Sequence, residues 1–158
     1  MPHTHTDTAA KQDWEKRAIE TLSASGHRAG GARTAVVELL SEQDCCLTAQ
    51  QIHDRLRSEE RKVGIASVYR ALDVLEELEL VHRLEVGEGG SRYEPALPGG
   101  EHHHHVICDS CGEVTAFEDQ KLEDAIEKLG GRLEHIVGAH DVVIHGTCGN
   151  CAPSQRRN

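Results

Sequence analysis

The chain has 158 residues, enough for one compact domain or for two small domains that share a dimer interface. No apolar run approaches the roughly 20 residues that span a bilayer, and the first residues do not form a secretory signal, so we expect a cytoplasmic protein without membrane contacts. The net charge of −10 argues against general affinity for polyanions, so any DNA binding must depend on a local basic surface. In a reducing cytosol, six cysteines and twelve histidines indicate zinc chemistry rather than a disulfide scaffold.

Apolar periodicity predicts four helices in the first half of the chain. They are expected at 11–25 with Gly26 as the stop, at 32–40, from the capping-box pattern at 48–51 onward, and at 65–80. Two short strands, 82–86 and 91–94, flank a glycine-rich turn. Helices followed by a hairpin form the outline of a winged helix, although ordinary small α+β domains share this pattern.

Residues 95–101 predict a linker or hinge between the two halves. Beyond it we expect strands at 105–109 and 113–117, a helix at 118–129 stopped by Gly130-Gly131, and strands at 132–137 and 141–145. The fold class is therefore α+β. Because large apolar residues are few, we do not expect the second half to be stable without a metal or a partner subunit.

Two CxxC pairs carry the strongest chemical signal in the chain. Cys108 and Cys111, with Cys148 and Cys151, supply four thiolates, the ligand set of a closed structural zinc site. One zinc bound by both pairs would then hold together the two ends of the 36-residue segment between them. Two unrelated surface pairs or a redox disulfide are the alternatives, but a redox CxxC needs no second pair.

A run of four histidines follows the hinge. In an extended strand, His102 and His104 would face one way and His103 and His105 the other, so one tetrapeptide can contribute to two metal sites. A solvated polar tract is the alternative. Further ligands are available in pairs: Glu123 with His140 for one site, and His82 with Glu94 for the other. Cys45 and Cys46 are an extra ligand candidate or ordinary thiols.

Three motifs together resemble the ferric-uptake-regulator family over about residues 14–152. They are His102–Gly112 (HHHHVICDSCG), Ile65–Leu72 (IASVYRAL) and Cys148–Cys151 (CGNC). The resemblance implies a winged-helix DNA-binding domain at 1–94, a hinge at 95–101 and a metal-binding α/β dimerisation domain at 102–158. It also implies a metal-dependent transcriptional repressor that binds palindromic double-stranded operator DNA as a homodimer, controls metal-uptake genes and has no small-molecule substrate.

The resemblance also assigns ligand sets. It implies a structural zinc on Cys108, Cys111, Cys148 and Cys151, a regulatory metal on His82, Glu94, His103 and His105, and a third site on His102, His104, Glu123 and His140. Whether Cys46 or Glu94 completes the regulatory site stays open. In the recognition helix, Tyr69 suits base contact, whereas Ser67 and Arg70, with Arg33 on the second helix, suit phosphate contact.

The regulatory metal is expected to be zinc. Val81-His82-Arg83 resembles the zinc uptake regulator branch, and Ala116 stands where iron and peroxide sensors usually have an acidic ligand. Those sensors also tend to have a hinge histidine where this chain has Cys46. Against zinc, a cysteine common in the wing-to-hinge segment of zinc regulators is missing, and residues 91–95 look more like the iron and peroxide branch. An iron- or peroxide-responsive repressor, with Fe²⁺ or Mn²⁺ at this site, is the alternative.

We expect no enzyme. A zinc deaminase would show His-x-Glu and a proline before the first CxxC cysteine, and a metalloprotease would show His-Glu-x-x-His. Neither histidine motif occurs, and Ile107 precedes Cys108. A catalytic zinc, in a hydrolase or a deaminase, also keeps one coordination position open, whereas each cluster here has candidates for a full set. A plain zinc-ribbon interaction module would not explain the histidine pairs or the N-terminal half.

Overall fold

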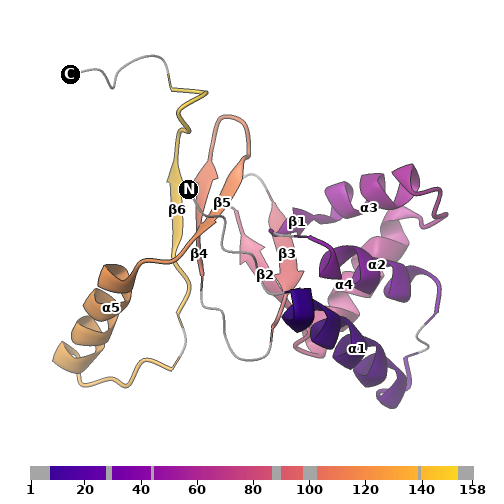
Figure 1. The fold of residues 1–158 in the computed structure, drawn as a ribbon, viewed down its shortest axis with the longest axis horizontal. Helices are drawn as coiled ribbons and strands as arrows, with labels where there is room; N and C mark the ends of the chain where they lie inside the picture. Colours follow the sequence, from indigo (N-terminus) through magenta and orange to yellow (C-terminus); the bar gives the residue numbers. More distant parts are fainter. Residues whose placement is uncertain are drawn as a thin grey trace. The chain divides into compact units, whose positions relative to one another are not determined.

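The computed structural model describes residues 8–27, 30–43, 45–86, 90–97, 103–138 and 140–152. The chain divides into two compact units, Met1–Glu101 and His102–Asn158 (Figure 1). Both units combine helices with a small sheet, so the expected α+β class is confirmed. Within the described ranges, no helix has the length and apolar character needed to cross a membrane.

The described residues of the first unit form four helices and a three-stranded antiparallel sheet (Figure 1). The helices are α1 (Thr8–Ala24), α2 (Ala32–Ser41), α3 (Ala49–Ser58) and α4 (Ile65–Glu77), and the strands are β1 (Leu47–Thr48), β2 (Val81–Glu85) and β3 (Ser91–Pro95). The strand order is β1-β3-β2. The winged-helix outline predicted four helices and the β2–β3 hairpin, but not β1, which is too short for alternation to reveal.

The core of this unit forms where the apolar stripes of all four helices meet. Fully buried members include Trp14, Leu40, Ile52 and Leu72. Burying one such leucine or isoleucine stabilises the fold by about 1.5–3 kcal/mol. The indole Nε1 of Trp14 donates a 2.7 Å hydrogen bond to the carbonyl of Leu80, so the polar edge of this buried ring is satisfied. This bond ties α1 to the segment that leads into the wing.

Local sequence signals explain where two of the helices begin or end. The Thr48 hydroxyl accepts from the amide N–H of Gln51, and the Gln51 side chain accepts from the amide N–H of Thr48, so the predicted capping box is confirmed. Gly26, with φ 76°, ends α1 as expected. The amide of His27 bonds to the carbonyl of Leu22, which is the 6→1 bond of a Schellman motif.

In the second unit, the part of the chain that the structure describes forms a three-stranded sheet and one helix (Figure 1). Its elements are β4 (His104–Cys108), β5 (Val114–Phe117), α5 (Gln120–Arg132) and β6 (Val143–Gly146). The strand order is β5-β4-β6; β4 pairs antiparallel with β5 and parallel with β6. Figure 1 shows α5 beyond one end of this sheet rather than over its face.

Two expectations for this unit are wrong. Helix α5 continues through Gly130 and Gly131 to Arg132, and residues 132–137 do not form a strand. The helix ends instead in a Schellman motif at Glu134, whose φ is 56° and whose following amide, of His135, bonds to the carbonyl of Gly130. Because glutamate rarely adopts a left-handed conformation, this helix end could not be predicted from the local sequence.

Candidate metal centres and DNA-binding helix

The two CxxC pairs come together at one end of the second sheet. Strands β4 and β6 run parallel, and Cys108 lies opposite Gly146, so the turns that follow the two strands are neighbours. Cys108 ends β4 and Cys111 lies in the turn that follows, whereas Cys148 and Cys151 lie in the segment after β6. All four Sγ atoms lie within 4.8 Å of one another.

The spacing of these sulfurs fits a tetrahedral zinc site. Four sulfurs at about 2.3 Å from zinc would be about 3.8 Å apart, and the Sγ atoms of Cys111 and Cys148 are 3.8 Å apart. The donor set also fits, because thiolates are preferred ligands of structural zinc. The four cysteines therefore suit a closed structural metal site.

Backbone amides stabilise a thiolate inside this cluster. The amide N–H of Cys148 donates to the Sγ of Cys108 over 3.3 Å. This bond is the main cause that lowers the pKa of Cys108 to about 6, with the amide of Cys111 next. The hydrogen bond with the neighbouring thiol of Cys148 instead raises the pKa of Cys151 to about 12. Cys108 is therefore ready to bind a metal as thiolate near neutral pH.

A second cluster joins the histidine run to α5. The His104 ring is fully buried, and its Nδ1 accepts from the amide of Val142 over 3.3 Å. Its Nε2 lies 2.6 Å from one carboxylate oxygen of Glu123, and the Nε2 of His140 lies 2.9 Å from the other. The structure thus brings together three of the four ligands predicted for the third site. His102, the fourth, lies outside the described residues.

The four ligands predicted for the regulatory site divide between the two units. In the first unit, His82 and Glu94 are directly opposite across β2 and β3, so their side chains share one face of the wing. In the second unit, the rings of His103 and His105 pack edge to face with centroids 4.8 Å apart. Each half of the set is therefore a local pair, and their union in one site stays a prediction.

Cys46, the alternative ligand for that site, is buried in the first unit. Its Sγ lies 3.8 Å from that of Cys45. This hydrogen bond, followed by burial, raises the pKa of the Cys46 thiol. In the absence of a metal the thiol therefore stays protonated at neutral pH.

The recognition-helix residues lie on α4 with an exposed outer face. Val68, Leu72 and Leu75 point into the core, whereas Tyr69 is 50% exposed and Arg70 is exposed. The guanidinium of Arg70 donates to the Ser67 hydroxyl over 3.3 Å. Arg33 lies half-buried in the first turn of α2. An exposed tyrosine beside an arginine on one helix suits contact with DNA.

One interaction near the cysteine cluster was not predicted. The Nδ1 of His145 on β6 lies 2.8 Å from the carboxylate of Asp109, which stands inside the first CxxC pair. This contact links β6, just before the second cysteine turn, to the turn that carries the first CxxC pair. A lone histidine on a strand gives no sequence signal for it, because the partner lies 36 residues away.

Known proteins resemble this chain over most of its length. The model of the Ferric uptake regulator family matches residues 24–150. The chain belongs to this family. The Ferric uptake regulation protein of Bacillus subtilis is 32% identical over 137 residues, which cover 85% of this chain and 92% of that protein. The Ferric uptake regulation protein of Neisseria gonorrhoeae is 29% identical over 140 residues, covering 88% and 96%.

Solved structures of ferric uptake regulators share the fold. The Helicobacter pylori structure, described as having three functional metal binding sites, has a TM-score of 0.80 and 28% identity, and covers 92% of this chain and 95% of that one. The Vibrio cholerae structure has a TM-score of 0.74 and 26% identity, covering 82% and 98%. The expected combination of a helix-turn-helix DNA-binding domain and a dimerisation domain is confirmed by this similarity.

Family membership fixes the broad function. As a member of this family, the chain is a metal-responsive transcription regulator and not an enzyme, as the sequence predicted. The matched range, 24–150, contains α2 to β6 and therefore the exposed face of α4 and three of the four clustered cysteines; Cys151 lies one residue beyond it.

Proposed function

We propose that this protein is a zinc-loaded homodimeric repressor that binds palindromic operator DNA in the cytoplasm and controls metal-uptake genes. The observation that carries the proposal is the four-sulfur cluster, whose 3.8 Å edge matches a tetrahedral zinc site. Zinc held there would close the second unit into a stable platform, because the energy of binding a structural zinc is energy of folding.

The surface of the second unit supports a homodimer. Its exposed large apolar side chains are Val106, Leu129, Leu133, Ile136, Val137 and Ile144. Val106 and Ile144 are neighbours across β4 and β6, and Leu129 and the C-cap residue Leu133 are one turn apart at the end of α5. A unit of 57 residues that leaves so much apolar surface exposed needs a partner. A second copy of this chain is the partner we propose.

The proposed regulatory site uses His82 and Glu94 from the first unit with His103 and His105 from the second. The two residues of each pair are neighbours within their own unit. Sharing one metal would tie the wing to the dimer and fix the separation of two α4 helices, which must match the half-sites of a two-fold operator. A metal acts in this way only if it binds the tied state more tightly; reversing a 99:1 equilibrium requires about a 10⁴-fold preference.

The third site, in this proposal, adds His102 to the described cluster of His104, Glu123 and His140. The carboxylate of Glu123 already joins the two imidazoles. Because this cluster links β4, α5 and the segment before β6, a metal there would brace the second unit rather than the hinge. The Helicobacter pylori relative, described as having three functional metal binding sites, supports a count of three.

DNA recognition is assigned to α4. Tyr69 would contact bases, and Ser67 and Arg70, with Arg33 from α2, would contact phosphates. The apolar stripe of Val68, Leu72 and Leu75 anchors the opposite side of the helix in the core, so the recognition face is held rigidly.

The alternative is that iron or manganese is the sensed metal. The relatives named above are ferric uptake regulation proteins. A site of three histidines and one carboxylate also accepts Fe²⁺ or Mn²⁺. Zinc remains our proposal because Ala116 lacks a carboxylate at the position of the acidic ligand that iron sensors usually carry.

The test is a titration with Zn²⁺, Fe²⁺ and Mn²⁺ at one fixed salt concentration, measuring binding to an operator selected from a random duplex library. Dimer mass and bound metal are measured in the same samples. We expect two classes of zinc: one that stays bound and maintains the dimer, and one whose binding follows DNA affinity. Tight DNA binding driven by iron but not zinc would overturn the zinc assignment and leave family membership intact.

A further inference from the structure

Basic residues gather at one place in this acidic protein. The last turn of α3 carries Arg55 and Arg57, and Arg61 and Lys62 follow in the loop before α4. Arg57 and Lys62 are exposed, and Arg61 is half-buried. With a net charge of −10, the chain can bind DNA only through such a local cluster of cations, because phosphate contacts dominate affinity for DNA.

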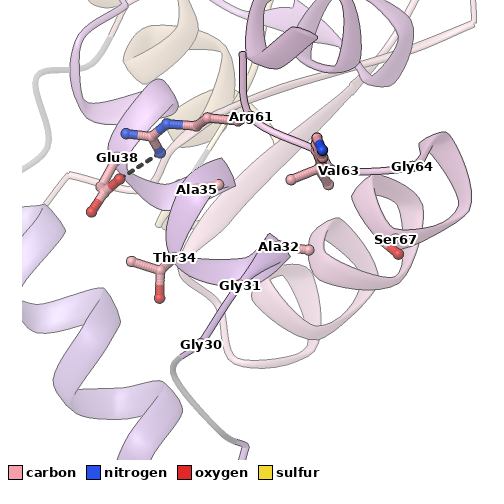
Figure 2. A pocket seen from close by; sticks show the side chains of 11 residues that line it. Gly30, Gly31, Ala32, Thr34, Ala35, Glu38, Arg61, Val63, Gly64 and Ser67 are labelled. Carbon is pink, nitrogen blue, oxygen red and sulfur yellow. Dashed lines mark hydrogen bonds and ion pairs between the residues drawn. The ribbon is translucent and has the colours of Figure 1, made fainter. Parts of the chain in front are cut away.

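This loop borders a hollow between the starts of α2 and α4. The hollow has a volume of about 670 Å³ and is lined by Thr34, Glu38, Arg61, Lys62 and Ser67 among others (Figure 2). A second hollow of about 520 Å³ shares Arg61–Gly64 with the first and adds Arg57 and Glu60. The segment Arg61–Gly64 therefore has a concave surface on both sides, and both surfaces carry cations.

The hollow is continuous with the proposed recognition face. Ser67, which lines it, accepts a hydrogen bond from Arg70, one turn farther along α4. Figure 2 shows Ser67 and Gly64 at the start of this helix, across the hollow from Thr34 and Ala32 of α2. A duplex lying along α4 would therefore present its backbone to the hollow.

Arg61 is held by an acidic neighbour in this hollow. Its Nη1 donates to the Oε2 of Glu38 over 2.5 Å, and its Nε lies 3.5 Å from Glu59 (Figure 2 shows the first pair). The side chains of Arg61 and Glu38 are 39% and 37% exposed, so the pair is open to water and to a competing anion. A phosphate approaching the hollow meets a cation whose charge is already partly neutralised.

We propose that Arg61 and Lys62 form a second phosphate-binding segment, outside the recognition helix, and that Glu38 limits its strength by competing for Arg61. The segment binds backbone phosphates of duplex DNA and carries no sequence information. This inference rests on the proposed DNA-binding function. The role of Glu38 is then to reduce the affinity of Arg61 for phosphate rather than to stabilise the core.

The experiment uses the full-length, metal-loaded protein and a random-sequence duplex of 30 base pairs, since phosphate contacts do not depend on sequence. The binding constant is measured over a series of salt concentrations. Each phosphate contact contributes about 0.9 to the slope of log K against log salt. We expect Arg61→Ala/Lys62→Ala to make this negative slope shallower, reducing its magnitude by about 1.8. The control, Lys121→Ala/Lys128→Ala on α5, removes two exposed cations from the other unit and should leave the slope as in wild type.

A second pair of variants tests the role of Glu38. Glu38→Gln should bind the duplex several-fold more tightly than Glu20→Gln, which removes the same charge from an exposed position on α1. Thermal melting checks that all variants fold, and Lys62→Ala alone, which removes an exposed side chain, covers the case in which loss of Arg61 disturbs the loop.

The outcomes separate this inference from the proposed function. If wild type binds no DNA with any metal, the proposed function fails. If wild type binds but Arg61→Ala/Lys62→Ala and Lys62→Ala keep the slope of the control, the phosphate-binding segment is wrong. If Glu38→Gln binds no more tightly than Glu20→Gln, the competition by Glu38 is wrong.

Discussion

Cys111 and Cys148 are 37 residues apart in the chain, yet their Sγ atoms lie 3.8 Å apart. This contact links the turn after β4 to the turn after β6, and zinc would make the link permanent. We expect Cys148→Ser or Cys108→Ser to lose zinc and the dimer together, because a structural zinc contributes on the order of 10–16 kcal/mol of folding energy. Metal content and sedimentation measure both effects.

The matched control for this prediction is Cys45→Ser, which removes a thiol outside the four-cysteine cluster. It should keep the same tightly bound zinc and the same dimer mass. A Cys148→Ser protein that stays dimeric and melts like wild type would contradict a structural role for the cluster.

Substitutions in the proposed regulatory site and in the proposed third site should have different effects. His103→Ala or His82→Ala should leave a folded dimer that keeps its cysteine-bound zinc but does not bind the operator tightly when zinc is added. His102→Ala or Glu123→Ala should mainly lower stability or shift the zinc response, because Glu123 braces His104 and His140 inside the second unit. Zinc titration of operator binding, with dimer mass and metal content, distinguishes them. Normal repression by His103→Ala, together with loss of the zinc response in His102→Ala, would mean that the two sites are reversed.

The exposed leucines of α5 should stabilise the dimer. Leu129→Gln/Leu133→Gln removes two apolar side chains that are 43% and 60% exposed in one chain. Burying a leucine contributes about 1.5–3 kcal/mol, so we expect the dimer to weaken more than about tenfold. The neighbouring exposed pair, Lys128→Gln/Glu134→Gln, should leave the dimer unchanged. Equal dissociation constants for the two double variants would place the interface elsewhere.

Different residues of α4 should determine the sequence preference of DNA binding and its overall affinity. Replacing Tyr69 by alanine should narrow the difference in affinity between operator and scrambled duplex, because a base contact is lost. Arg70→Ala should weaken binding to both duplexes, because a phosphate contact is lost. The magnitude of the slope of log K against log salt should fall by about 0.9. Fluorescence anisotropy at several salt concentrations measures both. If both variants bind the operator like wild type, α4 is not the recognition helix.

The two adjacent glycines of α5 should respond oppositely to alanine. A Cβ on Gly130 would lie 2.6 Å from the Cγ2 of Val137 and 3.0 Å from the carbonyl oxygen of His135, whereas a Cβ on Gly131 would meet nothing within 4 Å. Gly130→Ala should therefore destabilise the protein by about 1–3 kcal/mol through overpacking. Gly131→Ala should be neutral or stabilise the helix by about 0.5–1 kcal/mol. Denaturant unfolding of the metal-loaded protein tests this, and equal midpoints would contradict it.

The sequence alone determined the elements whose signals are local. Apolar residues repeat at helical spacing through α1 to α4 because one face of each helix must be buried, and the capping box at Thr48 and the turn at Gly26 mark helix boundaries through hydrogen bonds within a few residues. Ligand chemistry is local in the same sense. Two CxxC pairs and a histidine run identify metal-binding residues before any fold is known.

Only the tertiary structure decided what depends on distant neighbours. Helix α5 runs through Gly130, against which Val137 packs, to Arg132. Its last carbonyls are then satisfied by a Schellman motif in which Glu134, rather than a glycine, adopts the positive φ. The parallel pairing of β4 with β6 brings the cysteine turns together, and the ion pair of Arg61 with Glu38 joins α2 to the loop before α4. These contacts form between residues far apart in the chain, so local spacing carries no signal for them.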